Sequence, residues 1–137
     1  MRHQAKIRSV TQLILDSGGL TGLARQQHDI TTRIFFFKAK DLWPPVVPTV
    51  VMAESLSGRP HTDVHVSRLL KLCEIDEQVP KLLARRAGEL RALAKRGSAV
   101  DAIVVALAEP GGAVLTSDLA DMRALASYAD NVHVYRL

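Results

Sequence analysis

Four acidic residues each lie where an apolar run of the chain meets the start of a predicted helix. They are Asp16, Glu54, Asp101 and Asp118. Carboxylates beside such apolar segments are costly to desolvate unless a positive charge compensates them. If the fold brings the four together, their mutual repulsion requires a divalent cation. The acids are therefore the main functional feature of the sequence, and they predict a site for a hard metal ion such as Mg²⁺.

Each acid also has a purely structural explanation. Asp16 and Asp118 are suited to capping the helices that follow them, and Asp101 is the fourth position of a capping-box pattern. Asp121 would complete a second box after Asp118, and Glu54 can be a solvated helix residue. For any one acid alone, the structural explanation is at least as good as the functional one. Their conjunction favours function, because open parallel sheets place ligand sites beyond the carboxyl ends of their strands.

The elements that must position these acids alternate between strands and helices. We expect strands at 10–15, 46–47, 113–116 and 132–135. We expect helices at 20–27, from about 29 until shortly before Trp43, at 49–56, in the segment after Pro60, at 79–96, from 98 to about 108, and at 119–126. A strand that continues to Met52 is the rival interpretation of the third helix. This alternation predicts an α/β domain with a parallel sheet.

Length, charge and cysteine usage limit the classes of protein. The 137 residues fit one domain with a core of its own, and the formal net charge of +4 favours a polyanionic partner. The single cysteine, Cys73, excludes an intramolecular disulfide and suggests a reducing compartment. No apolar run approaches the roughly 18 residues of a membrane-spanning helix. We therefore expect a cytoplasmic protein without a membrane partner.

Four segments resemble the motifs of the PIN domain, particularly VapC-type toxins of type II toxin–antitoxin systems. They are ILDSG at 14–18, PTVVMAE at 48–54, VDAIV at 100–104 and LTSD at 115–118. Their order and spacing together make the resemblance specific. It implies a three-layer α/β/α fold with a central, mainly parallel sheet. On this basis, residues 10–137 are the PIN domain and residues 1–9 are an N-terminal extension.

The resemblance also implies an activity and its site residues. PIN domains are ribonucleases that depend on Mg²⁺ or Mn²⁺, so Asp16, Glu54, Asp101 and Asp118 are expected to be catalytic and to bind metal, with Asp121 as an accessory ligand and Ser17, Thr116 and Ser117 as supporting residues. VapC toxins are usually homodimers that a small VapB-like antitoxin neutralises. The chain departs from the family's pattern at Gly18 and Gly19, which replace the more usual larger side chains. This pair is expected to loosen the first loop.

The resulting hypothesis is metal-assisted hydrolysis of phosphodiesters in RNA. A housekeeping RNA-processing PIN nuclease and a non-catalytic nucleic-acid-binding subunit are the alternatives. A phosphoacceptor receiver domain fits poorly, because it requires an acidic pair after the first strand and a lysine after one of the last strands. The cations expected to contact phosphate are Arg85, Arg86, Arg91, Lys95 and Arg96, although for any single one a solvated helix face explains it equally well.

Four of the six aromatic residues lie close together: Phe35, Phe36, Phe37 and Trp43. Three consecutive phenylalanines cannot all face one side of a helix, which advances about 100° per residue. At least one of them should therefore point away from the core. We expect this helix to help form an antitoxin groove or a dimer interface. Burial between helices of the same domain is the alternative.

Overall fold

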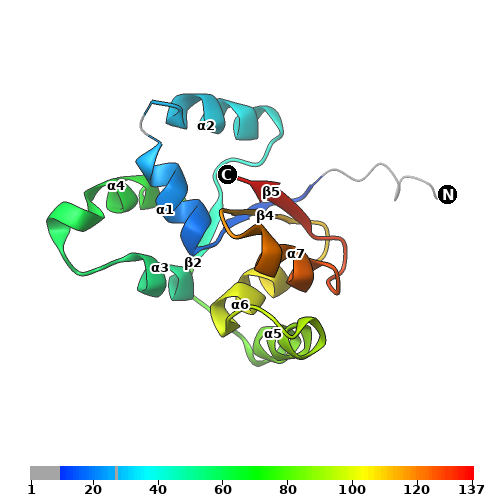
Figure 1. Ribbon diagram of the computed structural model, residues 1–137. Helices are drawn as coiled ribbons and strands as arrows, with labels where there is room; N and C mark the ends of the chain where they lie inside the picture. Colours follow the sequence, from blue (N-terminus) through cyan, green and yellow to red (C-terminus); the bar gives the residue numbers. More distant parts are fainter. Residues whose placement is uncertain (1–9, 27) are drawn as a thin grey trace.

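The computed structural model describes residues 10–26 and 28–137, so the N-terminal extension expected for residues 1–9 lies outside the described residues. Strands and helices alternate along the chain (Figure 1). In order, they are β1 (Leu13–Leu15), α1 (Ser17–Arg25), α2 (Ile30–Ala39), β2 (Val46–Pro48), α3 (Thr49–Ser55), α4 (Pro60–Leu70), β3 (Glu74–Asp76), α5 (Lys81–Ala94), α6 (Ala99–Ala108), β4 (Ala113–Thr116), α7 (Leu119–Ala126) and β5 (His133–Arg136).

The strands of the described chain form a five-stranded sheet in the order β3-β2-β1-β4-β5, and every pairing is parallel. The central strand is β1, and its neighbour β4 pairs with it so that Leu13 is level with Ala113 and Leu15 with Leu115. Both strands are completely buried. The expectation of a central parallel sheet is therefore confirmed, and Asp16 and Asp118 follow two adjacent interior strands of this sheet.

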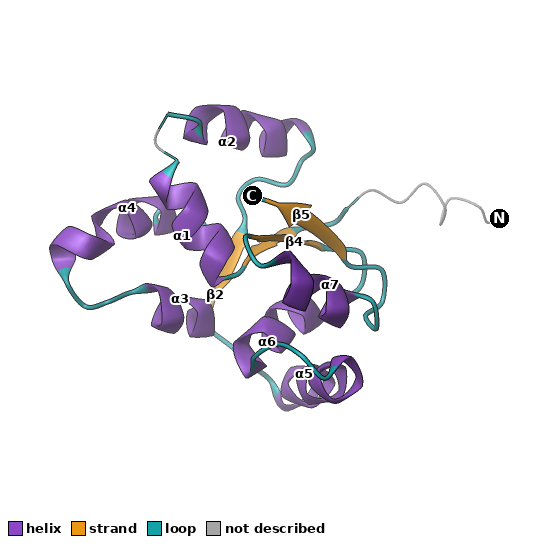
Figure 2. Ribbon diagram, viewed as in Figure 1, coloured by secondary structure: helices purple, strands orange, loops and turns teal. Residues whose placement is uncertain are grey.

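Helices cover both faces of this sheet. Figure 1 shows α5, α6 and α7 on one side and α1, α2 and α4 on the other, and Figure 2 shows the strands as the layer between them. This placement follows from right-handed crossovers, since the chain runs outward from β1 to β3 and then returns to β4 and β5. The most apolar helix is α6, which packs on β1 and β4. No helix in the described part of the chain is long and apolar enough to cross a membrane.

Most of the predicted elements match the observed ones. The segment after Pro48 is the helix α3, as expected, so the rival interpretation of a strand reaching Met52 is wrong. The first helix begins at Ser17, three residues before its expected start. The strand β3 was not expected, because it is only three residues long and its sequence, Glu74-Ile75-Asp76, is mostly exposed at the edge of the sheet. Its backbone pairs with β2, but its side chains give no apolar signal.

The glycines after Asp16 tighten the first loop and do not loosen it, which corrects the expectation from the sequence. Helix α1 begins at Ser17, so both glycines belong to its first turn. A Cβ on Gly19 would lie 2.0 Å from the carbonyl oxygen of Leu115, and one on Gly18 would lie 2.1 Å from the hydroxyl of Ser117. Only glycine therefore lets this turn pack directly against the end of β4.

An arginine on α5 ties together three segments on the other side of the sheet. The guanidinium of Arg86 donates to both carboxylate oxygens of Glu109, at 2.9 and 2.8 Å, and to the backbone carbonyl of Tyr128 at 3.2 Å. Glu109 also accepts from the backbone N–H of Asp130 at 2.7 Å. Arg86 therefore has a structural role, and it is not the exposed phosphate contact that the sequence suggested.

Helix α2 is anchored by one of its three phenylalanines. Phe37 is buried, and its ring packs edge-on against Tyr135 of β5 at 5.9 Å between centroids. Phe36 reaches the same tyrosine at 6.4 Å but is 44% exposed, and Phe35 is 73% exposed. The expectation that at least one phenylalanine points away from the core is confirmed. The exposed side of α2 therefore carries two large aromatic side chains beside polar ones.

Candidate functional site

A buried carboxylate lies at the end of β1. Asp16 is only 4% exposed, and its Oδ2 accepts a hydrogen bond from the hydroxyl of Thr116, the last residue of β4, at 2.5 Å. Its Oδ1 accepts from the backbone N–H of Gly19 at 2.6 Å, so the carboxylate also caps α1. The register of the sheet explains the contact with Thr116, because Leu15 and Leu115 are level and the next residues of both strands meet.

This position is the topological switch point of the sheet. The chain leaves β1 toward β2 on one side and leaves β4 toward β5 on the other. At such a point the connections diverge and leave a crevice beyond the carboxyl ends of the two strands, where open α/β sheets bind their ligands. Asp16 and Asp118 follow the two strands on either side of this switch point.

Two further carboxylates lie within electrostatic reach of Asp16. Asp118 is exposed at the start of α7, and its backbone N–H donates to the hydroxyl oxygen of Thr116 at 2.9 Å. Asp101 is half-buried in the first turn of α6, where it forms the predicted capping box with Ser98. Burial raises the pKa of Asp16, the hydrogen bonds from Thr116 and Gly19 lower it, and the charges of Asp101 and Asp118 raise it again, so that the net shift is upward.

The fourth acid, Glu54, is linked to the site by a hydrogen bond from a serine. The hydroxyl of Ser17, the residue after Asp16, donates to Oε1 of Glu54 on α3 at 2.5 Å. Glu54 is exposed, and Ser17 is half-buried. Of the expected supporting residues, Thr116 and Ser17 therefore each bond an acid of the site. Ser117 is exposed beside Gly18, and no hydrogen bond to a site acid is seen for its side chain.

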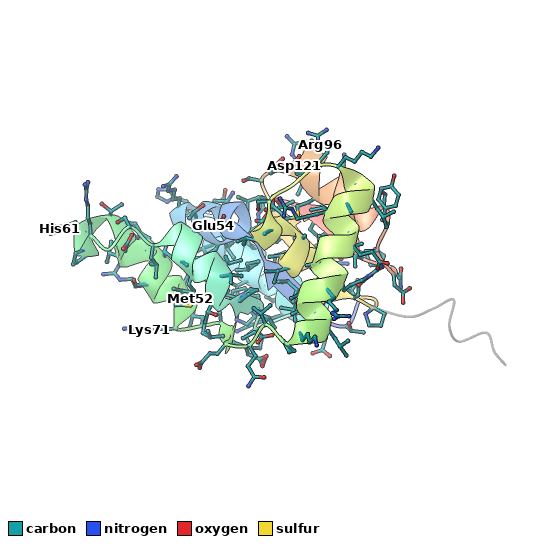
Figure 3. All side chains as sticks on the ribbon, turned by 90° about the horizontal axis from the view of Figure 1, so that it is seen from below. Met52, Glu54, His61, Lys71, Arg96 and Asp121 are labelled. Atoms are coloured by element: carbon teal, nitrogen blue, oxygen red, sulfur yellow. The ribbon has the colours of Figure 1, made fainter. Side chains whose placement is uncertain are left out.

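Asp121 is linked to the site and to a cation. Its backbone N–H lies 3.5 Å from Oδ1 of Asp118, as expected for a helix cap. Its carboxylate does not complete the second capping box that the sequence predicts. It accepts instead from Nε of Arg96 at 2.9 Å, and Figure 3 shows the two side chains next to each other. The sequence could not indicate this ion pair, because its members are 25 residues apart.

The donor atoms fit a hard divalent cation. Every side chain of the site offers carboxylate or hydroxyl oxygen, as Mg²⁺ and Mn²⁺ prefer. Within residues 10–26 and 28–137, no three acidic, histidine or cysteine side chains converge into a complete metal cage. Mg²⁺ does not require one, since it usually takes one or two carboxylates and completes its shell with water and substrate phosphate. An acid whose pKa is raised by burial, and further by two neighbouring acids, is suited to such an ion.

Comparisons with known proteins define the fold. No protein-family model matches the chain, and no curated protein matches it significantly. Among solved structures, PAE2754 from Pyrobaculum aerophilum is 14% identical, with a TM-score of 0.61 over 93% of this chain and 92% of that one. VapBC2 from Rickettsia felis, bound to a DNA fragment from their promoter, is 15% identical, with a TM-score of 0.67 over 93% of this chain and 99% of that one.

The fold is therefore the three-layer α/β/α fold of the PIN domain, with a central parallel sheet. The arrangement of the chain resembles that of the VapBC2 structure. The expectation of a PIN-like fold is confirmed. At 14–15% identity the likeness concerns the arrangement of the chain, and the chemistry has to be argued from its own residues.

The raised pKa of Asp16 predicts a specific dependence of stability on pH. The folded state holds this proton more tightly than the unfolded state, so the contribution of Asp16 to the free energy of unfolding falls as the pH rises above its ordinary pKa of 3.8. Urea unfolding without divalent metal, from about pH 4 to about pH 7, measures it. The Asp16→Asn variant should gain stability over the wild type progressively across this range.

Glu109 provides a control of opposite sign. The hydrogen bonds from Arg86 hold the pKa of Glu109 below its ordinary value of 4.5, so its contribution is present above that pH and lost as the pH falls through the lowered pKa. Glu109→Gln should therefore be less stable than the wild type near neutral pH, with the difference shrinking in acid. A stability difference between Asp16→Asn and the wild type that stays constant with pH would contradict this account of Asp16.

Proposed function

We propose that the protein is a metal-dependent endoribonuclease that uses Mg²⁺, or Mn²⁺, to hydrolyse phosphodiesters in RNA, and that it is the toxin of a toxin–antitoxin pair. The observation that carries the proposal is that Asp101 and Asp118 lie within electrostatic reach of the buried Asp16 at the switch point of a PIN-type sheet. The net charge of +4 also favours a polyanionic substrate. Single-stranded or looped RNA is the expected form, because its backbone can enter an open crevice.

We assign a role to each site residue from its burial and its hydrogen bonds. Asp16, fixed by Thr116 and Gly19, is the rigid ligand, and Asp118 and Asp101 are the neighbours that complete the negative site. A divalent cation bound there would supply an activated water and stabilise charge on the scissile phosphate. Glu54, held by Ser17, can orient the attacking water or a ligand water. Asp121 acts as an accessory that orients bound water.

A cleavage assay with purified protein tests the proposed activity. RNA should be cut in Mg²⁺ and left intact in EDTA, and Asp101→Asn should lower the rate by at least about a hundredfold, because a carboxylate that holds the divalent cation is lost. This substitution suits the test because an asparagine oxygen can still accept the capping hydrogen bond that Ser98 donates.

Asp29→Asn is the matched control, since Asp29 is exposed and its side chain makes no capping hydrogen bond at the start of α2. The control should cleave like the wild type. Cleavage that persists in EDTA, or at full rate in Asp101→Asn, would exclude the metal mechanism. Binding of RNA without any cleavage would instead favour a non-catalytic nucleic-acid-binding subunit.

The exposed face of α2 supports the second half of the proposal, a protein partner. Phe35 and Phe36 are both exposed, and Lys40 lies over the Phe36 ring at 5.1 Å from its centroid. Exposed aromatic pairs of this kind mark protein interfaces. We propose that this face contributes to the groove for a VapB-like antitoxin or to a homodimer interface. The fold neighbour from Rickettsia felis is itself a VapBC complex.

The substitution Phe36→Glu tests the role of this face. It should weaken antitoxin binding or shift a dimer toward monomer by at least about tenfold, because it places a charge in an apolar contact. Analytical ultracentrifugation and a binding titration with the product of any neighbouring antitoxin-like reading frame measure the two effects. Ala84→Glu, at an exposed position of α5 on the other side of the sheet, should change neither. Unchanged dimerisation together with unchanged antitoxin affinity would remove α2 from the interface.

A further inference from the structure

A basic hollow lies at the carboxyl end of α5. Its volume is about 440 Å³, and its lining residues are Gly88, Arg91, Ala92, Lys95, Arg96 and Gly97. Three of these six residues are cations, and none is acidic. Arg91 and Lys95 are one helical turn apart on the same face, and both are exposed. The hollow therefore concentrates positive charge on a surface that water and ligands can reach.

The hollow borders the carboxylate site through the turn between α5 and α6. Lys95 has a left-handed backbone with φ of 56°, and Gly97 follows with φ of 87°, so the chain turns sharply there. The turn brings Arg96 to Asp121, which it bonds through Nε at 2.9 Å. A Cβ on Gly97 would lie 3.6 Å from the Cβ of Asp101. The same four-residue connection thus carries the cations on one side and contacts two acids of the site on the other.

Two small residues, Gly88 and Ala92, form what we call the floor of the hollow. Gly88 and Ala92 lie one turn apart on α5 and both line it. Glycine inside a helix weakens the helix relative to alanine, and a Cβ at Gly88 would meet no described atom within 4 Å. Packing inside the described chain therefore gives no reason for a glycine here. A ligand that lies close against the helix surface does give one.

We propose that this hollow binds backbone phosphate of a single-stranded RNA on its way into the carboxylate site. Arg91 and Lys95 contact phosphate directly, and Arg96 joins them while it holds Asp121. The guanidinium group offers paired N–H donors to a phosphate, and the ammonium group acts as a compact charge. A negative catalytic site repels a polyanion, so a cationic holding point beside it is needed to keep the strand in place. This inference rests on the proposed function only where it says that the RNA strand leads into the carboxylate site.

A simpler explanation is that these cations stabilise the end of α5. Positive side chains near a helix C-terminus are favoured by its partial negative charge, and Arg91 lies in the last turn. That explanation predicts a loss of stability when the charges are removed and no particular effect on RNA. The two explanations therefore differ in a measurable quantity, the affinity for RNA at a given salt concentration.

The test is a pair of matched double variants. Arg91→Gln with Lys95→Gln removes the two cations of the hollow for which no ion pair is seen within the described residues. Arg68→Gln with Lys71→Gln removes the same two residue types from exposed positions at the carboxyl end of α4, outside the hollow. Binding of a short fluorescent single-stranded RNA is followed by anisotropy in EDTA, at several salt concentrations. Thermal unfolding of each variant checks that the fold is retained.

The hollow variant should bind RNA about tenfold more weakly, and the magnitude of its log–log salt slope should fall by about 1.4, since each lost phosphate contact to a single strand removes about 0.7. The control variant should stay within about twofold of the wild type in affinity. Equal losses in the two variants would mean diffuse attraction to net charge and would overturn the proposal. Unchanged affinity in the hollow variant would overturn it as well.

A substitution without charge tests the floor separately. Gly88→Leu should weaken RNA binding while the thermal midpoint stays the same or rises, because leucine favours the helix but fills the hollow. Ala84→Leu, one turn earlier and exposed, should leave RNA binding unchanged. If Gly88→Leu binds RNA like the wild type, no strand lies against this floor.

Cleavage kinetics separate this proposal from the proposed function. In Mg²⁺, the Arg91 and Lys95 double variant should show a raised KM with kcat close to that of the wild type, as expected for lost substrate holding. If the wild type cuts no RNA at all, the nuclease proposal fails, while the difference in RNA affinity between the two double variants still supports or overturns the hollow. A lowered kcat at unchanged KM would contradict a holding role.

Discussion

The hydrogen bond from the Thr116 hydroxyl to the Asp16 carboxylate organises this molecule, because it joins the ends of two adjacent interior strands across 100 residues of sequence. The same hydroxyl oxygen accepts from the backbone of Asp118, so one side chain fixes a buried acid and the start of α7 together. Gly19 completes the arrangement by letting α1 approach the end of β4. The site exists where it does because two buried parallel strands end at the same level.

Much of this arrangement was predictable, since the strongest signals were local. The strand at 113–116 and the helix at 119–126 were expected with the bounds that the structure gives them. A short apolar run bounded by Gly112 and Asp118 can only be satisfied by burial on both faces, which identifies a central strand. Because the carboxyl ends of parallel strands share an edge, an acid after each such strand is enough to predict that Asp16 and Asp118 meet.

The remaining contacts depend on side chains that no local pattern connects. Ser17 and Glu54 are 37 residues apart, and Arg96 and Asp121 are 25 apart, so their pairing follows only from the packing of α1 on α3 and of the α5–α6 turn on α7. The strand β3 was not predicted, because it is recognised by its backbone pairing with β2 and not by buried side chains. The capping role of Asp101 was foreseen. The capping role explains how α6 begins. The charge of Asp101 contributes separately to raising the pKa of Asp16.

The central claim is that the carboxylates around Asp16 form a site for a divalent cation, and Mn²⁺ binding followed by electron paramagnetic resonance tests it most directly. The wild type should bind Mn²⁺ in competition with Mg²⁺, Asp16→Asn should bind it at least about tenfold more weakly, and Asp29→Asn should bind it like the wild type. Absence of binding by the wild type, or undiminished binding by Asp16→Asn, would contradict the claim.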